Sequence, residues 1–299
     1  MDQAQMMAKI ERGDGFIAAL DQSGGSTPKA LKGYGYDGDE WSNDEEMFGL
    51  IHDMRSRIIR SPSFGGGKVL GAILFERTMD GTIDGKPVPQ VLIDKGIVPF
   101  IKIDKGLEDE ANGVQMMKPM PRLIDLLTRA RNLGVFGTKE RSVINLANPD
   151  GVSAVVEQQF NVARQVLSQG LVPIIEPEVN IKSAERDAAD RLLLNAILLE
   201  LESIPNGQRV MLKLSIPAEP NLFQPLVEHP RVLRVVALSG GFSRAEACSE
   251  LAKNPGMIAS FSRALLSDLR HDMNDDEFDS SLGTAIDEIY DASTEKVPA

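Results

Sequence analysis

Cysteine and histidine are scarce in this chain of 299 residues. It contains one cysteine, Cys248, and three widely separated histidines, His52, His229 and His271. A single cysteine excludes an intramolecular disulfide framework and fits a reducing compartment. Transition-metal sites are usually built from closely spaced His and Cys ligands. We therefore expect no metal site of this kind.

Positive charge and long apolar runs are also in short supply. The chain has 32 lysines and arginines against 44 aspartates and glutamates, a net charge of −12. This balance argues against nucleic acid or an anionic membrane surface as a partner, although a local cluster of cations can still hold a small anion. No apolar stretch reaches membrane-spanning length, and the N-terminus lacks the apolar core of a signal peptide. We expect a cytoplasmic protein.

Short apolar segments with the character of buried strands recur along the chain. Eight are found, at residues 15–21, 69–75, 98–104, 135–146, 172–179, 208–215, 231–239 and 257–262. Between them, apolar side chains recur every three or four residues, which predicts helices. These helices are expected near residues 47–58, 123–133, 156–167, 183–201, 243–251 (behind a Ser243–Glu246 capping box) and 278–289.

Apolar strands that alternate with helices predict a parallel sheet covered by helices, an α/β fold. Eight such units favour a (β/α)8 TIM barrel over an open doubly wound sheet, whose G-x-G-x-x-G motif is missing from the first strand–helix turn. Polar residues stand at or near the strand ends, where barrel enzymes carry their chemistry. We predict a single domain over residues 1–299, with a helical C-terminal tail from about residue 272.

Charged residues stand inside several of the apolar segments, mostly in pairs two positions apart. They are Lys102 with Asp104, Lys139 with Arg141, Glu176 with Glu178, and Lys213 alone in VMLKLS. Residues two apart on a strand point to the same face. Because unpaired buried ions are costly, these cations and carboxylates must meet one another or a charged ligand. The pattern is typical of an active site.

Lys213 is a candidate nucleophile. Its neighbours are apolar, and burial favours the neutral form of an amine, which condenses with a carbonyl to form a Schiff base. A structural lysine paired with Glu176 or Glu178 is the alternative. The two glutamates can divide the work of moving protons and keeping a lysine charged, or they can be structural ion pairs. Asp21, at the end of the first strand, is another candidate carboxylate or else a helix cap.

Gly-Gly turns follow two of the predicted strands. LSGGFS places Ser239, Gly240 and Gly241 before a capped helix, where backbone N–H groups and the helix dipole suit a phosphate. Arg263 follows the next strand, at the usual phosphate corner of a barrel. The other turn, in DQSGGS, carries two serines, Ser23 and Ser26.

In this order and spacing, from about residue 15 to residue 270, the segments resemble class I fructose-1,6-bisphosphate aldolase, the Schiff-base type in its short bacterial form. The resemblance implies that Lys213 forms the Schiff base with the ketose C2. Glu176 corresponds to the general acid/base that dehydrates the carbinolamine, and Glu178 to its companion. Asp21 corresponds to the carboxylate that takes the C4 hydroxyl proton, and Lys139 to the lysine that orients this hydroxyl.

The resemblance also implies where the two phosphates bind. Ser239, Gly240 and Arg263 correspond to ligands of the C1 phosphate, and Gly241 belongs to the same turn. Cations corresponding to Lys102 and Arg141 serve the far phosphate and the substrate hydroxyls, with Ser23 and Ser26 nearby.

Three features depart from the animal enzymes. Ala30 stands where those enzymes carry a base after the first Gly/Ser turn, and Ser262 replaces a glycine beside Arg263. The chain ends in KVPA and its last tyrosine is Tyr290. The terminal tyrosine that assists proton exchange in the animal enzymes therefore has no counterpart in the KVPA end.

The expected reaction is reversible cleavage of fructose 1,6-bisphosphate to dihydroxyacetone phosphate and glyceraldehyde 3-phosphate, a step of glycolysis and gluconeogenesis, with no metal or other cofactor. A transaldolase or a tagatose-bisphosphate aldolase is the nearby alternative, and Lys102 with Arg141 favours a bisphosphate. A binding protein without chemistry would have lost Lys213, Glu176 or Asp21. The implied partner is a sugar bisphosphate, and a homo-oligomer stays open because barrel aldolases commonly associate.

Overall fold

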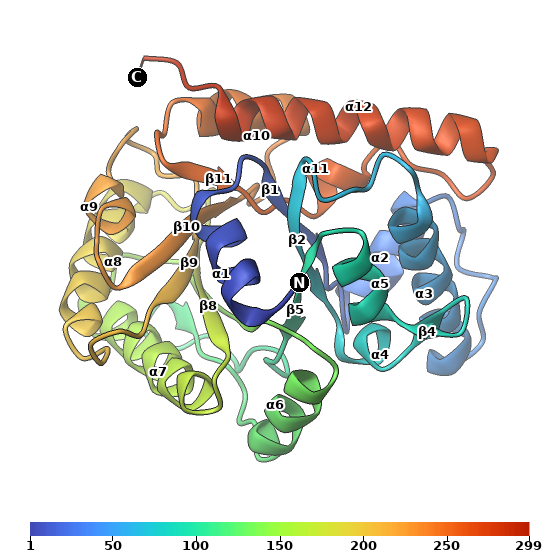
Figure 1. Cartoon of the computed structure of the whole chain (residues 1–299). Coiled ribbons are helices and arrows are strands. Elements are labelled where there is room, and N and C mark those ends of the chain that lie inside the picture. Colours follow the sequence, from blue (N-terminus) through green and yellow to red (C-terminus); the bar gives the residue numbers. More distant parts are fainter. Residues whose placement is uncertain (299) are drawn as a thin grey trace.

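A computed structural model describes residues 1–298, and its centre is a sheet of eight parallel strands curled into a nearly closed barrel (Figure 1). In pairing order the strands are β1 (Phe16–Leu20), β2 (Val69–Leu74), β5 (Val98–Lys102), β7 (Gly137–Ile144), β8 (Val172–Val179), β9 (Val210–Ser215), β10 (Val232–Leu238) and β11 (Met257–Ala259). Each predicted apolar segment contains one of these strands. The prediction of a single (β/α)8 TIM barrel is confirmed.

Helices cover the outside of the barrel between the strands. They are α2 (Ser26–Gly33), α3 (Asp44–Arg60), α4 (Glu76–Met79), α5 (Val88–Asp94), α6 (Leu123–Asn132), α7 (Pro149–Ser168), α8 (Arg186–Leu201), α9 (Gln224–Val227), α10 (Arg244–Ala252) and α11 (Arg263–Leu266). The helix expected to begin at Ser183 begins at Arg186 instead. Ser183 lies in a turn, where its hydroxyl accepts a hydrogen bond from the N–H of Glu185 at 3.2 Å.

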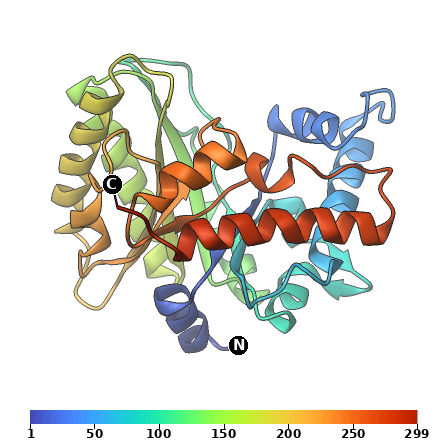
Figure 2. The same ribbon diagram turned by 90° about the horizontal axis from the view of Figure 1, so that it is seen from above.

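The last helix, α12 (Asp275–Thr294), lies along one side of the barrel next to α10 and α11 (Figure 2). Its side chains Phe278, Leu282, Ile286 and Ile289 are buried, as their spacing of three and four residues predicts. Minor strands complete the fold: β6 (Val114–Gln115) pairs antiparallel with β7, and β3 (Thr82–Ile83) forms a small hairpin with β4 (Lys86–Pro87).

The seam between β1 and β11 is held more weakly than the other strand junctions. The other neighbouring pairs form parallel ladders, with a register shift near the start of β1–β2 and of β9–β10. At the seam, the N–H of Ala19 donates to the carbonyl of Phe261 at 3.1 Å. Side-chain hydrogen bonds between the two edges therefore matter for the positions of the residues that follow β1 and β11.

The inward-facing positions of the strands change from apolar to charged along the barrel axis. In β8 the order is Val172, Ile174, Glu176, and β9 brings Lys213 two residues after Met211. The amino-terminal half of the barrel is thus an apolar plug and the carboxyl-terminal half is charged, because alternate strand residues share a face.

A helix that sequence analysis did not predict, α1 (Gln3–Arg12), lies in front of the amino-terminal opening (Figure 1). Met6 and Ile10 pack onto the apolar plug. Two signals for it are present in the sequence: the Asp2–Gln5 capping box and the four-residue spacing of these apolar side chains. By covering this opening, α1 leaves the carboxyl-terminal end for the site.

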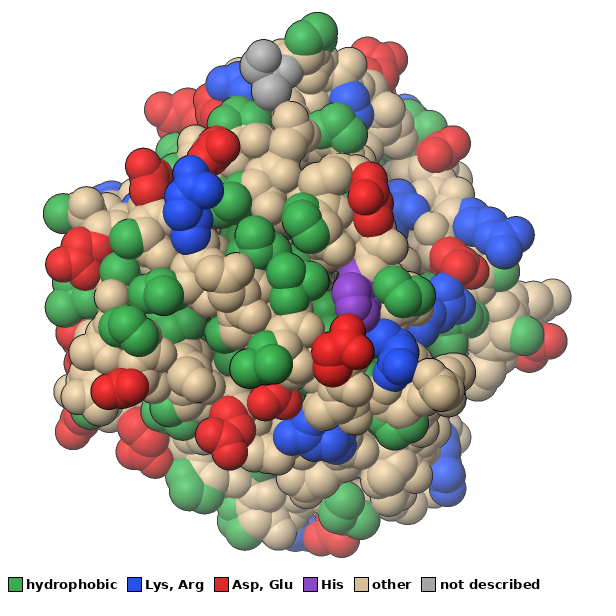
Figure 3. Space-filling model, turned by 90° about the vertical axis from the view of Figure 1, so that its left-hand side faces the viewer, with side chains coloured by type: hydrophobic (Ala, Val, Ile, Leu, Met, Phe, Trp, Pro, Cys, Tyr) green, Lys and Arg blue, Asp and Glu red, His purple; other side chains and the backbone are tan. Residues whose placement is uncertain are grey.

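The outer face that carries α8 has apolar side chains near its centre, with charged ones mostly around them (Figure 3). Leu199, in α8, is 75% exposed. Sequence analysis identified no such patch, since the apolar residues of α8 are spread around the helix. No helix within residues 1–298 has the length and apolar character needed to cross a membrane.

Candidate active site

A cavity of about 790 Å³ opens at the carboxyl ends of the strands. Its lining brings together residues predicted for the site from seven separate parts of the chain: Asp21, Ser23, Ser26, Lys102, Lys139, Arg141, Glu176, Glu178, Lys213, Ser239, Gly240 and Arg263. Gly241 follows Gly240 in the same turn. Sequence spacing therefore selected residues that line one cavity, although it did not predict which of them touch.

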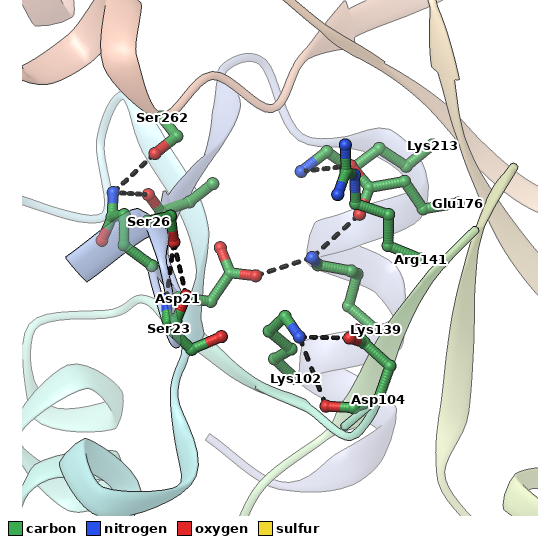
Figure 4. Close-up of polar contacts among 12 residues, drawn as sticks. Asp21, Ser23, Ser26, Lys102, Asp104, Lys139, Arg141, Glu176, Lys213 and Ser262 are labelled. Carbon is green, nitrogen blue, oxygen red and sulfur yellow. Dashed lines mark hydrogen bonds and ion pairs between the residues drawn. The ribbon is translucent and has the colours of Figure 1, made fainter. Parts of the chain in front are cut away.

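A chain of ion pairs crosses the floor of the cavity. Lys139 Nζ lies 2.6 Å from Asp21 Oδ2 and 2.8 Å from Glu176 Oε2 (Figure 4). The other oxygen of Glu176, Oε1, lies 3.1 Å from Lys213 Nζ. Lys213 is 4% exposed and Glu176 is 3% exposed. One glutamate thus bridges two buried lysines, and one of these lysines also holds Asp21.

Asp21, Lys139 and Glu176 hold one another ionised. Burial acts to raise the pKa of Asp21, but the cations Lys139 and Lys213 outweigh it and hold that pKa well below its usual range. Burial also opposes ionisation of Glu176, whose pKa is nevertheless lowered, chiefly by Lys139. Burial would lower the pKa of Lys139, yet the charges of Asp21 and Glu176 raise it. At neutral pH the cluster therefore holds two carboxylates beside a cationic Lys139.

Two further ion pairs stand at the wall of the cavity. Lys102 pairs with Asp104, and burial lowers the pKa of this lysine. Arg141 Nε lies 2.5 Å from Glu178 Oε2. Both glutamates of the EPE motif thus point into the cavity, but Glu178 contacts an arginine whereas Glu176 contacts the lysines. The ion pairs Lys139–Glu176 and Arg141–Glu178 both join β7 to β8. In each, the glutamate lies two residues beyond the register partner of the cation, since Lys139 is opposite Ile174 and Arg141 is opposite Glu176.

The Gly-Gly turn after β10 is shaped for close approach of a ligand to the backbone. Gly240 has a φ of 60° and Gly241 has a φ of 123°, values that side-chain-bearing residues rarely adopt. A Cβ added at Gly241 would lie 3.9 Å from Arg263 Nη2, so the guanidinium stands beside the turn. Ser239, at the end of β10, is 6% exposed. The turn therefore gathers N–H groups, a hydroxyl and an arginine at one corner of the cavity.

The serines after β1 contact each other at the start of α2. The N–H of Ser23 donates to Ser26 Oγ at 2.8 Å, and this hydroxyl donates to the carbonyl of Ser23 at 2.7 Å. Ala30 lines the same side of the cavity, together with Lys29. Lys29, one residue before the position where a base was expected, was not chosen from the sequence.

Ser260 is a second residue that sequence analysis missed. It lines the cavity after β11 and is 1% exposed, and its hydroxyl has no hydrogen-bond partner among residues 1–298. A signal was present, since Ser260 stands two positions after Ile258, which faces the barrel interior. A buried hydroxyl left free beside Arg263 and the Gly-Gly turn suits an anionic ligand.

The C-terminal segment lies at the opposite end of the barrel from the cavity. Lys296 Nζ donates to the carbonyl of Met257, the first residue of β11, at 2.8 Å, and burial lowers the pKa of this lysine to about 8. Tyr290 stacks under Lys68, just before β2, at 5.6 Å from ring centre to Nζ. The last tyrosine therefore stands near the amino-terminal ends of the strands.

The fold and the site together define a barrel enzyme whose cavity holds buried lysines and carboxylates, with Arg263 and the Gly-Gly turn at one corner. A family model described as fructose-bisphosphate aldolase class-I matches residues 2–213. The chain belongs to this family of aldolases, and is accordingly a lyase. The match includes Asp21, Lys139, Glu176 and Lys213, and the Gly-Gly turn after β10 lies beyond it.

Solved structures support the same architecture. Fructose-bisphosphate aldolase of Plasmodium falciparum, in a complex with TRAP and an inhibitor, is 20% identical and superposes with a TM-score of 0.79 over 99% of this chain and 95% of its own. A Schiff-base-forming fructose-1,6-bisphosphate aldolase is 11% identical, with a TM-score of 0.54 over 98% and 100% of the two chains. A Corynebacterium glutamicum protein is 12% identical, with a TM-score of 0.55 over 97% and 92%. At these identities the likeness concerns the fold.

Proposed function

We propose that this aldolase cleaves fructose 1,6-bisphosphate reversibly to dihydroxyacetone phosphate and glyceraldehyde 3-phosphate, through a Schiff base on Lys213. The observation that carries the proposal is the contact of the Lys213 amine with Glu176 at 3.1 Å, inside a cavity that also holds Arg263 and the Gly-Gly turn. An amine next to a carboxylate can exchange the protons that imine formation requires.

The first half of the reaction builds the imine. The Lys213 amine attacks C2 of the ketose, and the Glu176 carboxylate takes up the proton that the amine gives up. Glu176 then returns this proton to the hydroxyl of the resulting carbinolamine, which leaves as water. The product is a protonated imine, which is an electron sink next to C3. The neighbouring cation Lys139 holds Glu176 in place between the two amines.

The second half breaks the C3–C4 bond. Asp21 takes the proton of the C4 hydroxyl, C4 becomes the aldehyde carbon, and the electrons of the broken bond pass into the imine to form an enamine. Lys139, 2.6 Å from Asp21, orients this hydroxyl. Glyceraldehyde 3-phosphate leaves and Asp21 releases its proton to solvent, while C3 takes up one proton from solvent. Water then hydrolyses the protonated imine, Glu176 accepts the proton set free, and dihydroxyacetone phosphate and the free amine are released.

The two phosphates are assigned to separate cationic regions of the cavity. The C1 phosphate binds the N–H groups of Gly240 and Gly241, the hydroxyls of Ser239 and Ser260, and Arg263. The far phosphate and the hydroxyls of the sugar use the remaining polar groups of the lining: Lys102, Arg141, Ser23 and Ser26. Charge-assisted contacts of this kind explain how a protein with a net charge of −12 holds a dianionic group at each end of its substrate.

Borohydride trapping tests the proposal. Reduction in the presence of fructose 1,6-bisphosphate should leave one covalent adduct, located on Lys213 by peptide mapping, and turnover should persist in EDTA without gain from Zn²⁺. An adduct on another lysine would overturn the assignment of Lys213. Turnover of fructose 1-phosphate as fast as the bisphosphate would remove the role of the far phosphate, and preference for tagatose 1,6-bisphosphate would change the substrate.

Arg263→Ala should raise the KM for the bisphosphate. Losing one charge-assisted contact costs about 1.5–3 kcal/mol, which is roughly a 10- to 100-fold loss in kcat/KM. Steady-state kinetics measure it, with Arg12→Ala as a control, since Arg12 is an exposed arginine at the far end of the barrel. A KM that does not move in Arg263→Ala contradicts the phosphate role.

A further inference from the structure

The most deeply buried cation outside the ion-pair chain is Arg55, on the inner side of α3. Its side chain is 0% exposed. One guanidinium nitrogen, Nη1, donates to Thr78 Oγ1 in α4 at 2.7 Å, and the other, Nη2, donates to the carbonyl of Gln22 at 2.5 Å. Burial of a guanidinium is expensive unless its donors are used. Because the mechanism above does not use Arg55, its burial calls for a separate explanation.

The side chain of Gln22 connects Arg55 to the seam between β1 and β11. Arg55 Nη2 also donates to Gln22 Oε1 at 3.2 Å. Arginine has only donors, so the carbonyl side of this amide must face Arg55 and its Nε2 must face away. That nitrogen donates to Ser262 Oγ at 2.5 Å and to the carbonyl of Ala19 at 3.2 Å. Arg55 thereby fixes which way the amide of Gln22 points.

The Gln22–Ser262 hydrogen bond joins two residues that are each next in sequence to a residue of the proposed site. Gln22 follows Asp21 in the chain, and Ser262 precedes Arg263. The Gln22–Ser262 bond lies beyond the Ala19–Phe261 backbone bond of the β1–β11 seam. Figure 4 shows Ser262 at the edge of the site on the side of Ser26, across from Lys213 and Glu176. The carboxylate and the arginine are thus tied together through one amide.

We propose that Arg55 is a positioning residue that, acting through Gln22, holds Asp21 and Arg263 in their relative places across the barrel seam. This inference rests on the proposed function for the meaning of Asp21 and Arg263. The guanidinium donates to Thr78 and Gln22, and to neither Asp21 nor Lys213, the two ends of the chain of ion pairs. Its effect is on geometry, and a displacement of about 1 Å of a reacting group costs on the order of 10²-fold in rate.

The test separates cleavage from imine formation. Trapping with dihydroxyacetone phosphate and borohydride requires the Lys213 amine, but this ligand has no C4 hydroxyl and makes no use of Asp21. In Arg55→Lys and Arg55→Met we expect kcat for the bisphosphate to fall by roughly 10- to 100-fold, while trapping at saturating dihydroxyacetone phosphate stays within about twofold of wild type. Lysine is no substitute here because it lacks the planar fork that spans Thr78 and Gln22.

Arg234→Lys is the matched control. Arg234 is also largely buried and donates to two backbone carbonyls, those of Glu11 at 2.7 Å and Gly13 at 3.2 Å, but at the amino-terminal end of the barrel. Its variant should lose thermal stability and keep the wild-type ratio of cleavage to trapping. If Arg55→Lys shows the same unchanged ratio, the positioning role is wrong.

A second variant tests the route through the amide and remains informative if Arg55→Met fails to fold. Gln22→Leu should lower kcat as Arg55→Lys does, and the double variant should be no worse than the worse single variant, because both remove one link. Additive losses would overturn the route through Gln22. Failure of wild type to cleave the bisphosphate would instead overturn the proposed function, and a crystal structure of Arg55→Lys would then decide whether Asp21 had moved.

Discussion

Lys213→Met should abolish bisphosphate cleavage and borohydride trapping together, with a loss of turnover on the order of 10⁴-fold or more. Covalent catalysis has no substitute once its nucleophile is removed. Methionine fills a similar space in the buried site, and Glu176 keeps its partner Lys139 at 2.8 Å. We therefore expect the variant to fold. Steady-state kinetics, mass spectrometry of the reduced complex and thermal unfolding measure the three effects.

Lys95→Met is the control for this prediction. Burial lowers the pKa of Lys95, whose amine donates to the carbonyls of Ile59 and Ser61 at 2.7 Å. Lys95 is not among the described residues that line the cavity around Lys213. Its variant should therefore keep both turnover and trapping. Residual turnover above about 1% in Lys213→Met would mean that another group forms the covalent intermediate.

Lys139→Met should cost both activity and stability. It removes the cation that Asp21 and Glu176 share, and so leaves two buried carboxylates close to each other with less compensation. Breaking a buried pair in this way destabilises proteins by about 3–5 kcal/mol. Turnover should fall by on the order of 10²-fold or more, since both proposed proton-transfer groups lose their partner. Urea unfolding and kinetics test the two effects.

The double variant Lys139→Met with Asp21→Asn supplies the matched control. It removes one of the two uncompensated charges, so its free energy of unfolding should exceed that of Lys139→Met alone, although neither should turn over well. If the double variant is less stable than wild type by the sum of the losses in Lys139→Met and in Asp21→Asn, the coupling between Asp21 and Lys139 is contradicted.

The dependence of stability on pH follows from the same pair. The pKa of Asp21 is lowered in the folded protein, so its contribution is present above its ordinary value of 3.8 and is lost as the pH falls below it. The pKa of Lys139 is raised, so its contribution is present below 10.5 and is lost as the pH rises further. Lys139→Met should therefore flatten both limbs of a plot of unfolding free energy against pH.

The barrel and the residues that line its cavity could be predicted from local patterns. Apolar runs alternating with helical stripes are properties of segments, and each predicted strand is present. Charges two positions apart, such as Glu176 and Glu178, had to face the same side because strand side chains alternate. The Gly-Gly turn could be located because positive φ angles favour glycine. These features depend on residues close together in the chain.

Pairing within the site was decided only by the tertiary structure. That Lys139 lies between Asp21 and Glu176, while Glu178 contacts Arg141, depends on the stagger of neighbouring strands and on closure of the barrel between β1 and β11. The same closure brings Gln22 to Ser262, and packing of α3 brings Arg55 to Gln22. Periodicity tells which face a side chain takes. It does not tell which distant residue stands opposite, because that contact is set by the packing of the whole chain.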